Sequence, residues 1–146
     1  MSRLDVLRPF IEKNLAAISG KERVTPDPSG EYSIPFGSAD VSVRLLDNPF
    51  PIVQLWSVLV AKPKKKARML ETINALNAAE TAVRIFKYDD MIIAAWEVPA
   101  DTLDDRQFRD VCVRFGEMAN RLDSDLAARF SGKTARGDED EDTVDA

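Results

Sequence analysis

Hydrophobic residues recur every three or four positions in three parts of the chain. This spacing puts apolar side chains on one side of an α-helix, so it predicts three amphipathic helices. The predicted helices cover residues 4–18, about 69–77 and about 105–130. Thr102 or Asp104 is expected to begin the last helix, because both residue types cap helix N-termini well.

Two hairpins are predicted among these helices, each joined by a turn of two residues. Residues 31–47 turn at 37–38, and residues 82–99 turn at 89–90. A two-residue turn determines which residues face each other across the hairpin. The resulting pairs are chemically consistent, with mostly apolar residues opposite apolar ones. They include Ile34 with Val41, Tyr32 with Val43, Phe86 with Ile93 and Val83 with Trp96.

A further strand is predicted at residues 52–61, between the first hairpin and the second helix. It is apolar on both sides apart from Gln54 and Ser57, as expected of a central strand. Pro35 has no N–H to donate, so the strand that contains it is expected at a sheet edge. The element order is helix, three strands, helix, two strands, helix. This order predicts an α+β fold with a mostly antiparallel five-stranded sheet.

The last three predicted strands carry more apolar surface than one layer of helices can cover. On one side they present Trp56, Val58, Phe86 and Ile93. An uncovered patch of this kind would exceed what soluble monomers normally expose. We therefore predict that a second copy of the chain or a segment of a partner protein covers it. The alternative is that the three helices wrap both faces of the sheet within one chain.

The same reasoning predicts a homodimer, with the second helix and the last three strands near its interface. The candidate interface residues are the apolar residues of that helix, Met69, Leu70, Ile73 and Leu76. The candidate partner-binding residues are Trp56, Val58, Asn77, Arg84, Phe86 and Ile93. Asn77 could bind a partner's backbone or end the second helix in a left-handed conformation. Arg84 could bind a partner's carboxylate or pair with an acid inside the chain.

The acidic character of the chain is concentrated at its end. The 146 residues carry a formal net charge of −5. Residues 133–146 hold six acidic and two basic residues, so the rest has 19 acidic and 18 basic residues and is nearly neutral. This composition predicts one folded domain over residues 1–131 and a disordered acidic tail over residues 132–146.

The composition also excludes several kinds of catalytic and metal site. The chain has no histidine and a single cysteine, Cys112, which rules out Cys/His zinc sites, His-based triads and a disulfide within one chain. None of the six glycines belongs to a phosphate-binding loop, so we expect no enzyme activity, metal or cofactor. Charges interrupt the apolar pattern of the N-terminal residues, unlike that of a signal peptide or membrane span, so the cytoplasm is the simplest location.

A lysine-rich stretch, KPKKKAR at residues 62–68, has two interpretations. It could bind nucleic acid or another anionic surface, or it could be a solvated loop. We favour the loop, and no nucleic-acid partner, because the folded body is nearly neutral and no aromatic residues lie between the lysines. Lysines at the start of a helix oppose its dipole and attract an anion. We therefore expect the acidic tail to fold back loosely onto this stretch, within one chain or across a dimer, and to compete with acidic partners.

Five segments of the chain resemble the YbjN-type domain family, whose members are called bacterial sensory transduction regulators. They occur in order and cover most of residues 27–132: DPSGEYSIPFGSADVSVRL, PIVQLWSVLV, INALNAAETAVRIF, VPADTLDDRQF and ANRLDSDLAARFSG. The chain is especially similar to actinobacterial members related to type III secretion chaperones. One departure is Ser131, where the family usually has the first glycine of a Gly-Gly pair. It affects only the end of the last helix.

The resemblance implies a secretion-chaperone-like fold and a homodimer that holds extended peptides in apolar grooves and at sheet edges. The family has no catalytic residues to carry over. We therefore predict a non-enzymatic protein-binding module, a chaperone-like homodimer that covers an apolar segment of a partner. The alternative is a signalling regulator that senses a small molecule or a partner's state in an apolar pocket.

Overall fold

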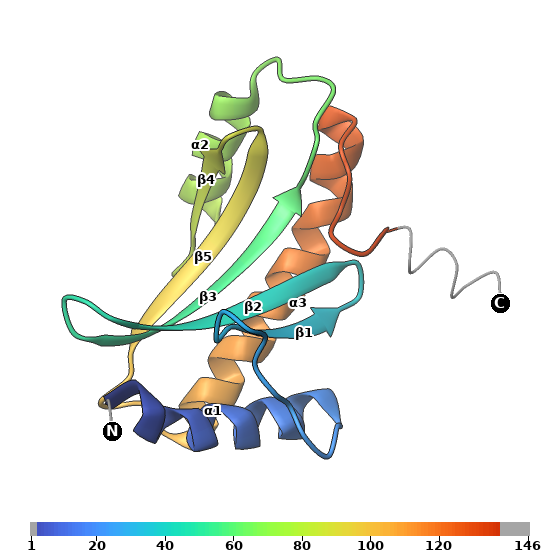
Figure 1. Cartoon of the computed structure of the whole chain (residues 1–146). Helices are drawn as coiled ribbons and strands as arrows, with labels where there is room; N and C mark the ends of the chain where they lie inside the picture. The colour runs from blue at the N-terminus through green and yellow to red at the C-terminus, as the bar shows by residue number, and fades with distance from the viewer. Residues whose placement is uncertain (1–2, 138–146) are drawn as a thin grey trace, which may run out of the picture.

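The computed structural model describes residues 3–137 (Figure 1). The predicted element order and the α+β fold class are both confirmed. Among the described residues, no helix combines the length and hydropathy needed to cross a membrane. The elements are α1 (Arg3–Ser19), β1 (Tyr32–Phe36), β2 (Ala39–Asp47), β3 (Pro51–Val60), α2 (Met69–Ala79), β4 (Arg84–Tyr88), β5 (Met91–Pro99) and α3 (Asp105–Phe130).

The five strands form one antiparallel sheet in the order β1-β2-β3-β5-β4. The predicted hairpin registers are confirmed along the paired strands, with Ile34 opposite Val41 and Phe86 opposite Ile93. The predicted pair of Val83 with Trp96 is not part of the ladder, because β4 begins at Arg84. The strand that contains Pro35 lies at an edge, and β3 lies at the centre, as predicted. Two-residue turns and a period of two along each strand left little freedom in these registers.

Helices α1 and α3 cover one face of the sheet (Figure 1). Alternate residues of the strands point toward them, and most of these are buried, including Val41, Val43, Val53, Leu55, Leu59, Ile85, Ile92 and Ala94. They meet the buried side of α3, where Phe108, Phe115 and Phe130 lie at the spacing of helical turns. Cys112 lies on the same side of α3, and burial raises the pKa of its thiol to about 12.

Helix α2 lies beside β4, at the end of the sheet farthest from β1. Its residues Met69 and Ile73 are buried in the core of the same chain. This corrects the prediction that both belong to a dimer interface, because their side chains already attach α2 to the sheet. Leu70 is 68% exposed and Leu76 is half-buried, so these two predicted interface residues remain at the surface.

The chain that follows α3 packs against the sheet. Lys133 and Ala61 exchange two backbone hydrogen bonds of 2.8 Å each, and the Arg136 N–H donates to the Ser38 carbonyl at 2.9 Å. The boundary predicted between folded domain and tail therefore lies inside the packed part of the chain. The remainder of the predicted tail, residues 138–146, lies outside the described residues.

Candidate functional site

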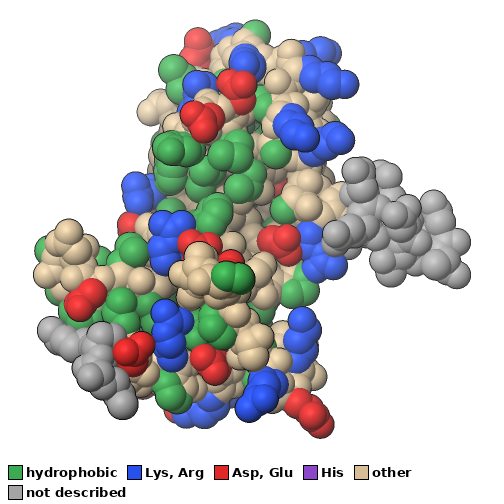
Figure 2. Space-filling model, viewed as in Figure 1, with side chains coloured by type: hydrophobic (Ala, Val, Ile, Leu, Met, Phe, Trp, Pro, Cys, Tyr) green, Lys and Arg blue, Asp and Glu red, His purple; other side chains and the backbone are tan. Residues whose placement is uncertain are grey.

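The face of β3, β5 and β4 that points away from α1 and α3 is the candidate site, here called the open face. None of the described helices lies over it (Figure 1). Figure 2 shows hydrophobic side chains gathered there. They surround a hollow of about 350 Å³. Its lining consists of Trp56, Phe86, Tyr88, Met91, Ile93 and Ala95, with Arg44 and Gln54 at one end.

Strand pairing brings five of the six predicted partner-binding residues together on the open face. Ile93 on β5 lies between Val58 on β3 and Phe86 on β4. In the neighbouring row, Ala95 of β5 lies between Trp56 and Arg84. The two rows adjoin because residues two apart on a strand share a face. The open face therefore carries an apolar strip that crosses three strands.

Two arginines lie over the aromatic rings of this strip. The Arg44 guanidinium is 5.5 Å from the centre of the Trp56 ring, and that of Arg84 is 5.1 Å from the centre of the Phe86 ring. These distances suit cation–π contacts, in which the side-chain stems also shield the rings from water. A ligand on the open face would therefore meet aromatic surface bordered by two arginines that are each paired with an acid of the same chain, Arg44 with Glu31 and Arg84 with Glu97.

Arg84 is paired with an acid of its own chain, which was one of its two predicted roles. Its Nη2 atom lies 2.9 Å from Oε2 of Glu97, which also accepts a 2.8 Å hydrogen bond from Gln54. Burial raises the pKa of Glu97, but the hydrogen bonds from Arg84 and Gln54 outweigh it and hold the pKa below its ordinary value. Because more than half of the Arg84 side chain is exposed, it still borders the open face.

Asn77, the sixth predicted partner-binding residue, lies away from the open face. Its amide nitrogen donates to the Ile85 carbonyl at 2.8 Å, and its amide oxygen accepts from the Ile85 N–H at 2.9 Å. In this way the side chain binds the backbone of β4 as a neighbouring strand would. The amide therefore acts on the chain's own sheet edge and ties α2 to it.

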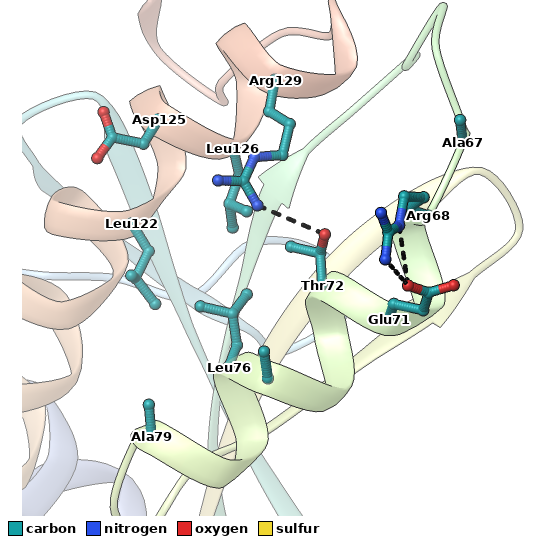
Figure 3. A pocket seen from close by; sticks show the side chains of 11 residues that line it. Ala67, Arg68, Glu71, Thr72, Leu76, Ala79, Leu122, Asp125, Leu126 and Arg129 are labelled. Atoms are coloured by element: carbon teal, nitrogen blue, oxygen red, sulfur yellow. Dashed lines mark hydrogen bonds and ion pairs between the residues drawn. The ribbon is translucent and has the colours of Figure 1, made fainter.

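A second hollow of about 850 Å³, here called the helix groove, lies between α2 and α3 (Figure 3). Its apolar lining includes Ala75, Leu76, Ala79, Leu122 and Leu126. Four charged residues, Arg68, Glu71, Asp125 and Arg129, stand around it. Sequence reasoning found only Leu76 of this set. The available signal was the pair of small residues, Ala75 and Ala79, spaced one turn apart on α2.

The apolar lining of both hollows suits the binding of apolar groups. Among residues 3–137, no three acidic or sulfur-bearing side chains lie close enough together to hold a metal ion. The single thiol, Cys112, is buried beneath the opposite face of the sheet.

Solved structures with the same fold include proteins that bind other proteins. A chain of the ExsC–ExsE complex has 14% identity and a TM-score of 0.64, with 84% of this chain and 97% of that chain covered. A chain of the HopA1–SchA chaperone–effector complex has 11% identity and a TM-score of 0.64, with 85% and 98% covered. YbjN from E. coli has 17% identity and a TM-score of 0.65, with 90% and 95% covered.

Sequence comparison identifies the family. No curated protein matches the chain. A family model described as "T3SS (YopN, CesT) and YbjN peptide-binding chaperone 1" matches residues 5–138. This agrees with the fold, the strand order and the five segments that resemble YbjN-type proteins. The chain belongs to this family, TY-Chap1.

Proposed function

We propose that this protein is a peptide-binding, chaperone-like homodimer that covers an apolar segment of a partner protein. The observation that carries the proposal is the open face, where an aromatic and aliphatic strip crosses three strands with no helix of the described chain above it. Family membership supports it, as does the likeness to a chain from a chaperone–effector complex.

The bound segment is expected to dock through its side chains rather than as an added strand. In an antiparallel pair, alternate residues turn their N–H and C=O groups to the outer edge. On β4 such a residue is Ile85, and Asn77 already occupies both of its groups. On β1 such a residue is Pro35, which has no N–H. Both sheet edges are therefore poor templates for strand addition.

Binding through the open face is tested with Phe86→Asp. A polypeptide retained from native lysate is identified, and its apolar segments are titrated as synthetic peptides while tryptophan fluorescence is followed. Placing a carboxylate in the apolar strip is expected to weaken binding at least tenfold, since it must be desolvated without a partner. Phe50→Asp is the matched control, because Phe50 is 48% exposed and lies outside the hollow. Equal loss in both variants, or none in Phe86→Asp, would contradict the proposal.

The proposed dimer contact is the exposed side of α2, with Leu70 and the helix groove. Leu70 is the most exposed large apolar side chain among the described residues, which favours its contact with another surface. We expect light scattering at about 10 μM to give a dimer for the native chain and a monomer for Leu70→Asp. Val6→Asp is the control, because Val6 is 65% exposed on α1. A monomeric native chain would refute the dimer.

The helix groove favours a second candidate function, a regulator that senses a small molecule. Its volume of about 850 Å³ and its apolar floor fall within the range of small-molecule sites. Native mass spectrometry of the freshly purified protein distinguishes the two functions. A retained small molecule supports the regulator, and a retained polypeptide supports the chaperone.

A further inference from the structure

Backbone pairing brings four lysines together where the loop after β3 meets the end of α3. The Lys64 and Lys65 N–H groups donate to the Phe130 carbonyl at 3.0 and 2.9 Å. Lys133 forms its two backbone hydrogen bonds with Ala61, directly before Lys62. We call Lys62, Lys64, Lys65 and Lys133 the lysine cluster. Figure 2 shows Lys and Arg side chains gathered at this end of the molecule.

The lysine cluster is not neutralised by the described part of the chain. Its neighbours Lys66 and Arg68 are paired, with Asp90 at 2.8 Å and Glu71 at 2.6 Å. All four cluster lysines are exposed, and no carboxylate among residues 3–137 lies within ion-pair distance of them. The four charges therefore face solvent without a counter-charge.

The negative end of the α3 dipole balances only part of the positive charge of the lysine cluster. Lys64 and Lys65 cap the last turn of α3, where the helix dipole is negative and cations are favoured. That dipole is equivalent to about half an elementary charge. The four lysines carry about eight times as much, so most of their charge is available to another anion.

The next part of the sequence supplies such an anion. Directly after Gly137 come five consecutive acids, Asp138–Asp142, here called the acidic segment. Four residues link Lys133 to Gly137 and span at most about 14 Å. Five extended residues can turn back over about the same length. The acidic segment can therefore reach the lysine cluster of its own molecule.

We infer that the acidic segment occupies the lysine cluster of the same chain and shields it from acidic partners. Attachment within one chain gives an effective concentration in the millimolar range, which sustains contacts too weak to persist between separate molecules. The contact is electrostatic and exposed, so salt weakens it. An acidic partner segment must displace it to reach the lysines. This inference does not depend on peptide binding at the open face.

A spin label in the full chain tests the contact. Cys112 is buried and its thiol pKa is raised to about 12, so a label added to Val144→Cys reacts at residue 144 alone. At about 20 mM NaCl we expect broadened amide signals at Lys64, Lys65 and Lys133, which recover at about 500 mM. Absence of broadening, or broadening that salt does not change, would overturn the inference.

Two charge variants separate binding from mere proximity along the chain. Lys62→Asn, Lys64→Ser and Lys65→Ser together are expected to remove most of the broadening at Lys133. The matched control removes three exposed charges elsewhere, with Lys21→Ser, Arg23→Ser and Arg106→Ser. The control is expected to keep the broadening. Equal behaviour of the two variants would show that the label approaches without binding.

A competition measurement tests the shielding. Hexaglutamate is titrated into the native chain and into a full-length variant whose five acidic-segment residues are changed to Asn or Gln. The neutral variant is expected to bind about fivefold more tightly at low salt, because no attached competitor remains. Equal affinity of the two proteins would contradict shielding.

Discussion

Asp123→Ala is expected to lower the free energy of unfolding by about 3 kcal/mol, as measured by urea denaturation. Asp123 lies on α3 with its side chain fully buried. Both of its carboxylate oxygens lie 2.8 Å from the Ser38 hydroxyl, in the turn between β1 and β2. A buried polar group that loses its hydrogen-bond partner costs its full desolvation, and alanine leaves the Ser38 hydroxyl without this partner. The substitution therefore loosens the first hairpin from the helix beneath it.

The matched control for this prediction is Asp110→Ala on the same helix. Asp110 pairs with Arg114 at 2.9 Å, one turn further along, and both side chains are mostly exposed. Exposed pairs of this kind contribute about 0.3–0.5 kcal/mol. If the two alanine variants lost similar stability, burial of Asp123 would not be the source of its effect.

The sheet was predictable from the sequence because its constraints are local. Each hairpin turn has two residues, and a slip by one residue would move every apolar side chain to the wrong face. The pairs Ile34–Val41 and Phe86–Ile93 followed from these two constraints and are confirmed. The same reasoning placed Trp56 and Phe86 on one face, and the structure brings them into one hollow.

The position of α2 was not predictable in the same way. An amphipathic pattern indicates that one side of a helix is buried, but it does not name the surface that covers it. Met69 and Ile73 were assigned to a second copy of the chain, yet they pack into their own core. The helix groove was missed because it depends on the spacing of α2 and α3, which no local pattern encodes. Asn77 was expected either to bind a partner's backbone or to end α2 in a left-handed conformation. Instead α2 continues to Ala79, and the Asn77 amide binds the backbone of β4 in its own chain.

The end of the folded domain was misplaced because composition does not show backbone pairing. Residues 132–137 are small or charged, so they were assigned to the tail. Their hydrogen bonds use main-chain groups, which every residue type except proline supplies equally. Lys133 forms such bonds with Ala61, and this contact also positions one member of the lysine cluster.

Gly132→Ala is expected to cost about 2–3 kcal/mol of stability, measured by the same urea denaturation. A Cβ at this position would lie 2.5 Å from Cγ1 of Val60 and 2.8 Å from the Ala61 carbonyl oxygen. Val60 is fully buried and Ala61 is held by its hydrogen bonds to Lys133. Neither residue can therefore move aside without losing packing or hydrogen bonds. The backbone must separate instead, which weakens the junction between the loop after β3 and the end of α3.

The neighbouring substitution Ser131→Gly is the control and has the opposite expected sign. Ser131 ends α3 at φ 50°, a left-handed conformation that costs a residue with a Cβ about 1 kcal/mol and glycine almost nothing. Glycine at 131 should therefore raise stability slightly, while alanine at 132 lowers it. Both positions then favour glycine, but for different reasons: position 131 because of its left-handed backbone conformation, and position 132 because of close packing. A loss at both, or at neither, would contradict this assignment.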